Sequence, residues 1–375
     1  MSGDKKIRIV NVDDSAFMIK ALEMMLKGVD DIEIVGIAKN GKEAIEKVKQ
    51  LKPDVITLDI EMPVMDGISA LKVLMKESPL PVIMLSSLTT DGAESTMEAL
   101  SIGAADFIAK QSSFVSLDII KIKEELVSKI RYFAKNKFSV LQNLARQKVA
   151  QRKNSIPVKK TVPKKTINEN TLIGGSANPI LTSEPVIKIK NNTEIVVIGS
   201  STGGPAALQK VIPKLPKNFP LPVLIVQHMP PAFTKSLASR LDNLSNVSVC
   251  EAKDGEKMEA GKVYIAPGDR HMITKNKTNI SMSNLYPEAL HKPSVNVLMD
   301  SVNDIFGKRT VAVIMTGMGQ DGTLALEKLD KSGAYIIGQN EESCVVYGMP
   351  KIPNQKYSKV IVDVEDIADS IVKAL

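Results

Sequence analysis

The chain has 375 residues, of which 43% are hydrophobic and 24% are charged, close to ordinary globular values. These proportions exclude wholesale disorder, and the length predicts two or more domains at roughly 150 residues each. No apolar run approaches the ~18 residues that a membrane-spanning helix needs, the N-terminus lacks a signal-peptide core, and the two cysteines, Cys250 and Cys344, cannot build a disulfide framework. We therefore expect a cytoplasmic protein.

The net charge of +7 is unevenly distributed along the chain. Residues 126–168 contain twelve Lys or Arg and no Asp or Glu, whereas residues 1–125 carry −6 and residues 169–375 carry +1. A polybasic tract could contact an acidic surface or nucleic acid. Because neither flanking half is basic, we favour a solvated linker and expect no nucleic-acid partner.

In the first half, short apolar runs alternate with segments of helical period. Helices are expected to begin near Ser15, Gly41, Gly67 and Asp91, and another is expected to run from about Leu117 toward Val149. The expected strands are Ile7–Val12, Ile32–Ala38, Val55–Leu58, Val82–Leu85 and Phe107–Ala109. This alternation predicts a parallel sheet covered by helices on both faces.

A stretch rich in Lys, Pro, Asn and Gly follows and reads as a flexible linker to about residue 190. A second α/β block begins at Glu194. Its expected strands are Ile195–Gly199, Val223–Gln227, Val247–Cys250, Val263–Ala266, Val311–Thr316 and Ala334–Gly338. Its expected helices are Pro205–Val211, Phe233–Leu241, Val295–Phe306, Thr323–Lys331 and Ile367–Leu375.

Acidic residues follow two strands of the first half. Asp13 and Asp14 come after the first strand and Asp59 after the third, and open α/β sheets place their sites at the carboxyl ends of strands. Three converging carboxylates would attract a hard cation such as Mg²⁺. With Ser86 and Lys110 at the ends of the next two strands, the set predicts a phosphoacceptor site with Asp59 as the nucleophile.

The segments VDDS, LDIEMPVMDG, MLSS and DFIAK resemble the motifs of response-regulator receiver domains. The resemblance implies that a partner histidine kinase phosphorylates Asp59, with Mg²⁺ held by Asp13, Asp14 and Asp59. It also implies that Ser86 and Lys110 contact the phosphoryl group and that Phe107 is a rotating aromatic switch. One departure is Gln111, which stands where the family usually has proline.

In the second half, the run IVVIGSSTGGPAAL places Ser200 or Ser201 at a turn before a helix N-terminus, where the local field favours developing negative charge. A phosphate-binding glycine-rich loop is the alternative interpretation of this run. His228 follows the next strand, and Asp321 lies in a glycine-rich turn after a later one. Three strand-end loops that deliver Ser, His and Asp make an acyl-transfer triad plausible.

The segments GSSTGGP, QHMPPAF, YIAPGDRHM, KPSVNVLMDS and MTGMGQDG are similar to the catalytic domain of chemotaxis protein-glutamate methylesterases. The resemblance implies that Ser201 is the nucleophile, His228 the base and Asp321 the orienting carboxylate. It places the oxyanion hole at the backbone N–H of Met318, with Thr202 nearby. The family commonly has Arg in place of Lys292 and Asp in place of Asn296.

We therefore expect an α/β protein with two doubly wound domains and mainly parallel sheets. These would be a flavodoxin-like receiver in residues 1–125 and a Rossmann-like methylesterase domain in residues 191–375, joined by a helix and basic flexible linker in residues 126–190. The expected activity is phosphorylation-activated hydrolysis of glutamyl methyl esters on chemoreceptors, with deamidation of receptor glutamines, through an acyl-enzyme.

Mg²⁺ is expected at the receiver and no cofactor for the esterase step. The expected partners are a chemotaxis histidine kinase and methylated chemoreceptor cytoplasmic domains, without membrane insertion, and the default oligomeric state is a monomer. Three alternatives are a transcriptional regulator whose basic segment binds DNA, a non-catalytic scaffold, and a hydrolase of another small ester. A basic helical output domain would favour the first, but residues 169–375 are near-neutral.

Overall fold

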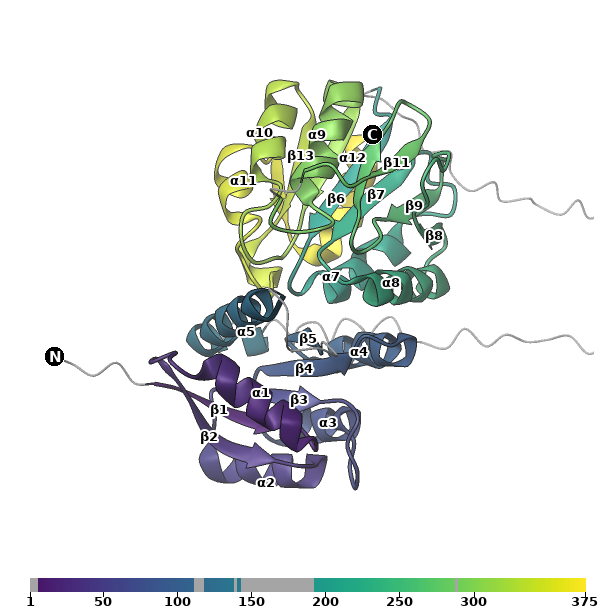
Figure 1. The fold of residues 1–375 in the computed structure, drawn as a ribbon. Helices are drawn as coiled ribbons and strands as arrows, with labels where there is room; N and C mark the ends of the chain where they lie inside the picture. The colour runs from purple at the N-terminus through teal and green to yellow at the C-terminus, as the bar shows by residue number, and fades with distance from the viewer. Residues whose placement is uncertain (1–5, 111–117, 138–139, 143–191, 287–288) are drawn as a thin grey trace, which may run out of the picture.

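The computed structural model describes residues 6–110, 118–137, 140–142, 192–286 and 289–375. Most of the predicted linker and Gln111 lie outside these residues. The described chain forms two α/β units that lie against each other (Figure 1). None of its helices is long and apolar enough to cross a membrane.

The N-terminal unit is a five-stranded parallel sheet in the order β2-β1-β3-β4-β5. The strands are β1 (Ile7–Val12), β2 (Ile32–Ala38), β3 (Val55–Asp59), β4 (Val82–Ser87) and β5 (Asp106–Lys110). The helices are α1 (Ala16–Leu26), α2 (Gly41–Leu51), α3 (Gly67–Glu77), α4 (Thr90–Ile102) and α5 (Asp118–Lys135). All five predicted strands are present, and α5 continues past residue 125.

Polar side chains fix where the receiver helices begin. The side chains of Ser15, Asn40, Asp66 and Thr89 each accept a backbone N–H from the first turn of α1, α2, α3 and α4, respectively. Because these caps follow β1, β2, β3 and β4, each helix starts just beyond a strand. The loops at the carboxyl edge of the sheet are therefore held in place.

The C-terminal unit is a seven-stranded parallel sheet in the order β14-β13-β12-β6-β7-β9-β8. Its strands are β6 (Ile195–Ser200), β7 (Val223–Gln227), β8 (Ser248–Glu251), β9 (Lys262–Ile265), β12 (Thr310–Ile314), β13 (Tyr335–Gln339) and β14 (Val360–Val362). Its helices are α7 (Gly204–Val211), α8 (Pro231–Leu244), α9 (Val295–Phe306), α10 (Thr323–Lys331), α11 (Lys351–Lys356) and α12 (Ile367–Ala374). A separate antiparallel pair joins β10 (His271–Thr274) and β11 (Ile280–Ser283). The predicted fold class is confirmed, while β10, β11, β14 and α11 were not anticipated.

Strand order explains how distant segments meet. The strands β12, β6 and β7 are neighbours in the sheet. The loops that follow them carry residues 315–322, 201–203 and 228–230. Because the strands are parallel, these loops emerge at the same edge.

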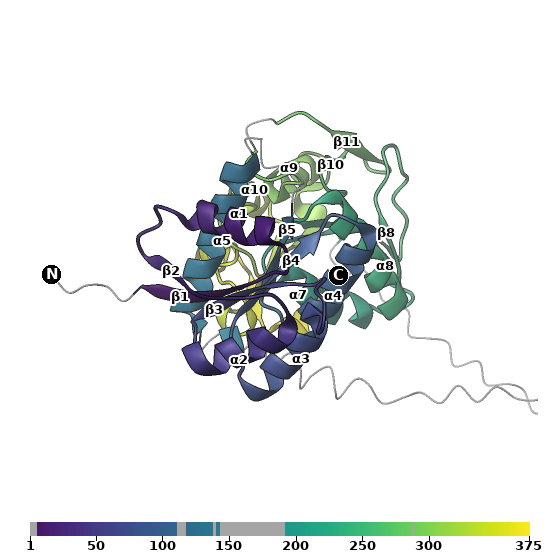
Figure 2. The same ribbon diagram turned by 60° about the horizontal axis from the view of Figure 1, so that its bottom comes forward.

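The N-terminal unit packs against the C-terminal unit through α4, β5 and α5, as two views show (Figures 1 and 2). The ring of Phe107 on β5 stacks on Phe233 of α8, with centroids 4.5 Å apart. Arg240 of α8 donates to the Ser101 hydroxyl of α4 at 2.7 Å and to the Gln209 side-chain oxygen at 2.6 Å. The interface thus combines a buried aromatic contact with a polar network.

Candidate functional site

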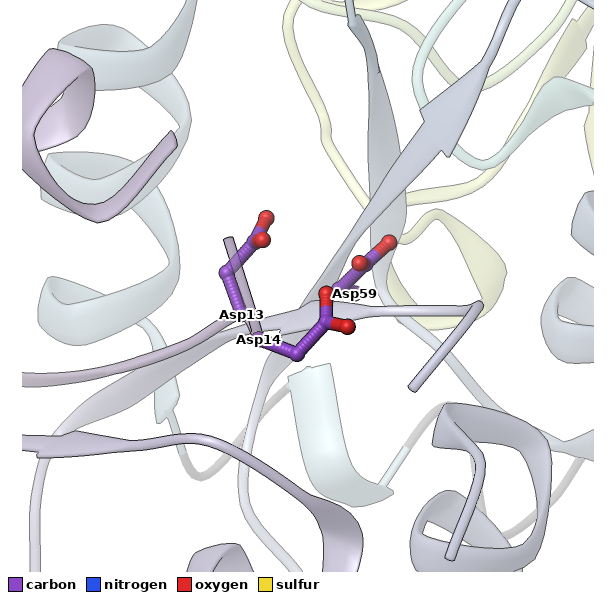
Figure 3. A group of neighbouring side chains, drawn as sticks. All are labelled: Asp13, Asp14 and Asp59. Carbon is purple, nitrogen blue, oxygen red and sulfur yellow. The ribbon is translucent and has the colours of Figure 1, made fainter. Parts of the chain in front are cut away.

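The receiver carries a compact acidic cluster at the carboxyl ends of β1 and β3. Carboxylate oxygens of Asp13, Asp14 and Asp59 lie within 4.8 Å of one another, and Figure 3 shows the three groups gathered at this edge. Asp13 and Asp59 are buried and Asp14 is exposed. Oxygen ligands at this spacing suit a divalent cation such as Mg²⁺, with the exposed side left for water and substrate.

Lys110 closes this cluster from the end of β5. Its ammonium lies 2.8 Å from an oxygen of Asp13 and 2.8 Å from one of Asp59. Burial, together with the negative charge of Asp13, raises the pKa of Asp59 overall although Lys110 acts in the opposite direction. Burial also lowers the pKa of Lys110, but its hydrogen bonds to the two carboxylates outweigh this and raise the pKa overall. Lys110 is therefore a fixed cation beside the proposed phosphoacceptor.

Ser86 on β4 and Phe107 on β5 are the remaining predicted contact and switch residues. The buried hydroxyl of Ser86 donates to the carbonyl oxygen of Gly92 at 2.9 Å, so it is engaged with the start of α4. Phe107 is buried against Phe233. The structure thus connects the predicted switch residue directly to the interface.

Lys129 of α5 is a buried charge that the sequence did not reveal. Its ammonium lies 2.8 Å from Asp106, donates to the carbonyl oxygen of Phe107 at 2.8 Å, and also pairs with Glu125. Burial lowers the pKa of Lys129, but the two carboxylates outweigh it and raise the pKa overall. Through Lys129, α5 is therefore attached to Asp106 and Phe107 of β5, and Phe107 lies at the interface with the C-terminal unit.

In the C-terminal unit, His228 and Asp321 form a hydrogen-bonded pair. His228 Nε2 lies 2.8 Å from Asp321 Oδ2, and the Asp321 carboxylate also accepts the backbone N–H groups of Val295 and Asn296 and the hydroxyl of Ser294. Burial raises the pKa of Asp321, but His228 and these donors outweigh it and hold the pKa well below its usual range. An Asp321 carboxylate that is ionised at neutral pH can orient the imidazole.

This arrangement leaves Nδ1 of His228 as the nitrogen that can act as a base. Nδ1 is buried and has no hydrogen-bond partner among the described residues. In the serine-protease template the carboxylate instead holds Nδ1 and frees Nε2. The carboxylate thus binds the other ring nitrogen than in that template.

The two candidate serines have different surroundings. Ser200 is fully buried, and its hydroxyl donates to the side-chain oxygen of Gln227 at 2.7 Å. Ser201 is partly exposed at the turn after β6, and its N–H donates to the carbonyl oxygen of Thr316 at 3.0 Å. In the described residues no hydrogen bond joins the Ser201 hydroxyl to His228. Ser200 is thus committed to the interior, which favours Ser201 as the nucleophile.

The predicted oxyanion residues flank Ser201. A Cβ placed on Gly317 would lie 2.9 Å from the Ser201 Cβ, so the turn that carries Met318 runs beside the serine. Within the described part of the chain, the backbone N–H groups of Thr202 and Met318 have no protein acceptor. Two N–H groups beside a serine can stabilise an oxyanion.

His291 is a further residue of the site that sequence reasoning left unassigned. Its ring stacks on that of His228 with centroids 4.1 Å apart and an interplanar angle of 23°. Burial, followed by the neighbouring His228, lowers its pKa to about 4.

Asn296, where the methylesterase family commonly has Asp, also has a defined position. Its side-chain oxygen accepts the N–H of Ala325 in the first turn of α10 at 3.0 Å. Its backbone N–H binds Asp321. The residue therefore joins the starts of α9 and α10 around the carboxylate.

An acidic phosphoacceptor edge joined to a Ser, His and Asp edge defines a response regulator with an enzymatic output domain. Residues 9–120 match the response regulator receiver domain and residues 196–371 match the CheB methylesterase. The chain belongs to the family of protein-glutamate methylesterases/protein-glutamine glutaminases.

Full-length relatives support this membership. The protein of this description from Bacillus subtilis is 46% identical over 370 residues and covers 97% of each chain. That from Halalkalibacterium halodurans is 43% identical over 374 residues and covers 99% of each. The solved catalytic domain of the Thermotoga maritima CheB methylesterase is 43% identical, with a TM-score of 0.47, and covers 49% of this chain and 99% of that one.

Proposed function

We propose that the chain hydrolyses glutamyl γ-methyl esters on the cytoplasmic helices of chemoreceptors and also deamidates receptor glutamines. The observation that carries the proposal is the ionised Asp321 bound to His228 at the sheet edge where Ser201 emerges. Names of relatives that cover the whole chain support both the ester and the amide as substrates.

The residues have distinct roles in the proposed reaction. The Ser201 hydroxyl oxygen attacks the ester carbonyl while His228 Nδ1 takes its proton, and Asp321 stabilises the imidazolium. The N–H groups of Met318 and Thr202 bind the oxyanion. Collapse expels methanol, which takes the proton from His228. A water then hydrolyses the glutamyl-serine ester by the same steps, giving the free glutamate.

The deamidation differs only in its leaving group. Attack on a glutamine carbonyl gives the same acyl-enzyme and releases ammonia in place of methanol. The same nucleophile, base and oxyanion donors therefore serve both reactions.

At the receiver, Asp59 would accept a phosphoryl group from a histidine kinase. Asp13, Asp14 and Asp59 would hold Mg²⁺, whose charge neutralises the transferring phosphoryl group. Lys110 already bridges Asp13 and Asp59 and would bind a phosphoryl oxygen.

The docked interface offers a way for phosphorylation of the receiver to control the enzyme. Contacts of α4, β5 and α5 with the second unit support a closed state in which the receiver restricts access to Ser201. Phosphorylation at Asp59 would weaken that state. The change is a shift between two populations, each with the same catalytic residues.

The test follows methanol release from methylated receptor membranes with and without acetyl phosphate. We expect wild type to release methanol faster with the phosphodonor and Ser201→Ala to release none above background. Ser332→Ala, at an exposed serine that ends α10, is the matched control and should retain activity. Full activity in Ser201→Ala would reject the assignment of the nucleophile, and absence of methanol release by wild type would reject the reaction.

A further inference from the structure

Each of the two predicted oxyanion N–H groups belongs to a peptide whose carbonyl oxygen accepts hydrogen bonds from neighbouring residues. The Gly317 carbonyl, in the peptide that ends in the Met318 N–H, accepts the N–H groups of Gly348 at 3.1 Å and Met349 at 2.8 Å. In a trans peptide the N–H points opposite to the C=O. Holding the Gly317 oxygen therefore fixes the direction in which the Met318 N–H is presented.

The second peptide is held in the same manner. The Ser201 carbonyl, in the peptide that ends in the Thr202 N–H, accepts the side-chain amide of Gln227 at 2.8 Å and the N–H of Gly204 at 2.8 Å. Gln227 is buried, and its oxygen is occupied by the Ser200 hydroxyl. Its amide is thus oriented with the NH₂ group toward the Ser201 carbonyl.

We propose that Gln227 and the segment 345–349, which contains Gly348, are positioning residues that orient the two oxyanion N–H groups. This inference rests on the proposed function, because it assigns the geometry of that same oxyanion hole. Neither element supplies a group that would touch the reacting atoms. Each acts through the peptide that it holds.

Close packing makes glycine at position 348 a requirement of this geometry. A Cβ there would lie 2.6 Å from the Gly317 oxygen, 3.2 Å from the Gly319 nitrogen and 3.3 Å from the Gly319 oxygen. Gly348 is not among the described glycines with positive φ. An alanine is therefore opposed by contact with the oxyanion turn and not by backbone conformation.

The side chain of Thr316 joins the serine loop to the segment 345–349. Its hydroxyl donates to the carbonyl oxygen of Thr202 at 2.9 Å and accepts the N–H of Val346 at 3.0 Å. Thr316 is buried. The segment 345–349, the oxyanion turn and the serine loop therefore form one connected unit.

The experiment compares full-length Gly348→Ala and Gln227→Met with wild type, each with acetyl phosphate. Removing an oxyanion donor reduces turnover by ~10²–10³-fold, so a misdirected donor should reduce kcat by about 10- to 100-fold. KM should stay within about 2-fold, because the oxyanion contact forms in the transition state and not with the bound substrate. The rate of Ser201 sulfonylation by phenylmethanesulfonyl fluoride, which also builds negative charge on oxygen, should fall in parallel.

Gly333→Ala is the matched control. Gly333 lies after α10, away from Ser201, and its φ of +86° makes alanine unfavourable for stability alone. The control should lower the thermal midpoint without changing kcat. A kcat for Gly348→Ala equal to that of the control, or a change confined to KM, would overturn the inference while leaving the esterase assignment intact.

Failure of the reaction itself has a different signature. If wild type released no methanol and Ser201 were not sulfonylated, the proposed function would fall and the positioning role with it. If Gln227→Met does not fold, Gly348→Ala alone decides the outcome, since it changes neither a hydrogen-bonding side chain nor a positive-φ position.

Discussion

The stack between Phe107 and Phe233 predicts how strongly the receiver restrains the enzyme. Phe233 lies in α8 and is fully buried, with its ring centroid 4.5 Å from that of Phe107. Phe233→Leu keeps an apolar side chain but removes the ring contact. The packing of Phe233 inside its own unit is the same in the docked and open states. The substitution therefore weakens this packing equally in both states, and the effect drops out of the free-energy difference between them.

The aromatic contact between Phe107 and Phe233 exists only in the docked state, so its loss does not cancel. Such a pair stabilises the docked state by about 0.5–1.5 kcal/mol beyond the effect of its buried area. A loss of about 1 kcal/mol in the docked state alone raises the open-to-docked ratio about five-fold, since 1.36 kcal/mol is ten-fold. While the open state is the minor one, the activity without phosphodonor should rise by the same factor. The maximal activity with acetyl phosphate should stay unchanged.

The assay is the initial rate of methanol release from methylated receptor membranes, with and without acetyl phosphate. Phe306→Leu is the matched control, because Phe306 is equally buried in the C-terminal unit but lies on α9 and not at the receiver. It should lower the thermal midpoint without activating the enzyme. If Phe233→Leu also lowers only the thermal midpoint, the stack does not restrain the docked state.

Three further predictions concern charges. Asp59→Asn should abolish the response to acetyl phosphate and leave the unstimulated rate of methanol release unchanged; continued stimulation would place the phosphoacceptor elsewhere. Lys129→Met should lower the free energy of unfolding by about 3–5 kcal/mol, because Asp106 then stays buried without its partner; urea titration measures this, and a loss below 1 kcal/mol would contradict the buried pair. His291 has a folded pKa of about 4 against an ordinary 6.5, so the unfolded chain binds this proton first as the pH falls. The contribution of His291 to the free energy of unfolding is therefore fully present above pH 6.5. It is lost as the pH falls toward 4, by about 3 kcal/mol in all. His291→Gln should remove this part of the loss in urea titrations at pH 7 and 4.5, and an unchanged pH dependence would refute it.

The sequence predicted those parts of the fold that depend on one segment at a time. Buried strands such as Ile195–Ser200 are continuous apolar runs, and caps such as Asn40 mark the helix starts. The missed strands are short and of mixed polarity, as in Ile280–Ser283, or have only three residues at the edge of the sheet, as in Val360–Val362. Such segments become strands because a neighbour pairs with them.

Some residues of the candidate site could likewise be predicted from a single segment, and others could not. Ser201, His228 and Asp321 could be predicted because each lies in the loop that follows a strand, where parallel sheets place their sites. The stack of His291 on His228 could not, because it depends on where the segment before α9 lies in three dimensions. The same is true of Gln227, whose strand position reads as an ordinary buried residue until its partners are seen. Their roles in catalysis stay predictions.

The path from phosphoacceptor to interface is short because one strand carries both ends. Lys110 ends β5 beside Asp59, and Phe107 lies three residues earlier on the same strand, against Phe233. A phosphoryl group on Asp59 adds negative charge and must compete with Asp13 for the Lys110 ammonium. Any shift of Lys110 acts on β5, and through it on Phe107. Because the Phe107 carbonyl also accepts the buried Lys129 ammonium, β5 and α5 should respond together, which would weaken the contacts of both elements with the C-terminal unit.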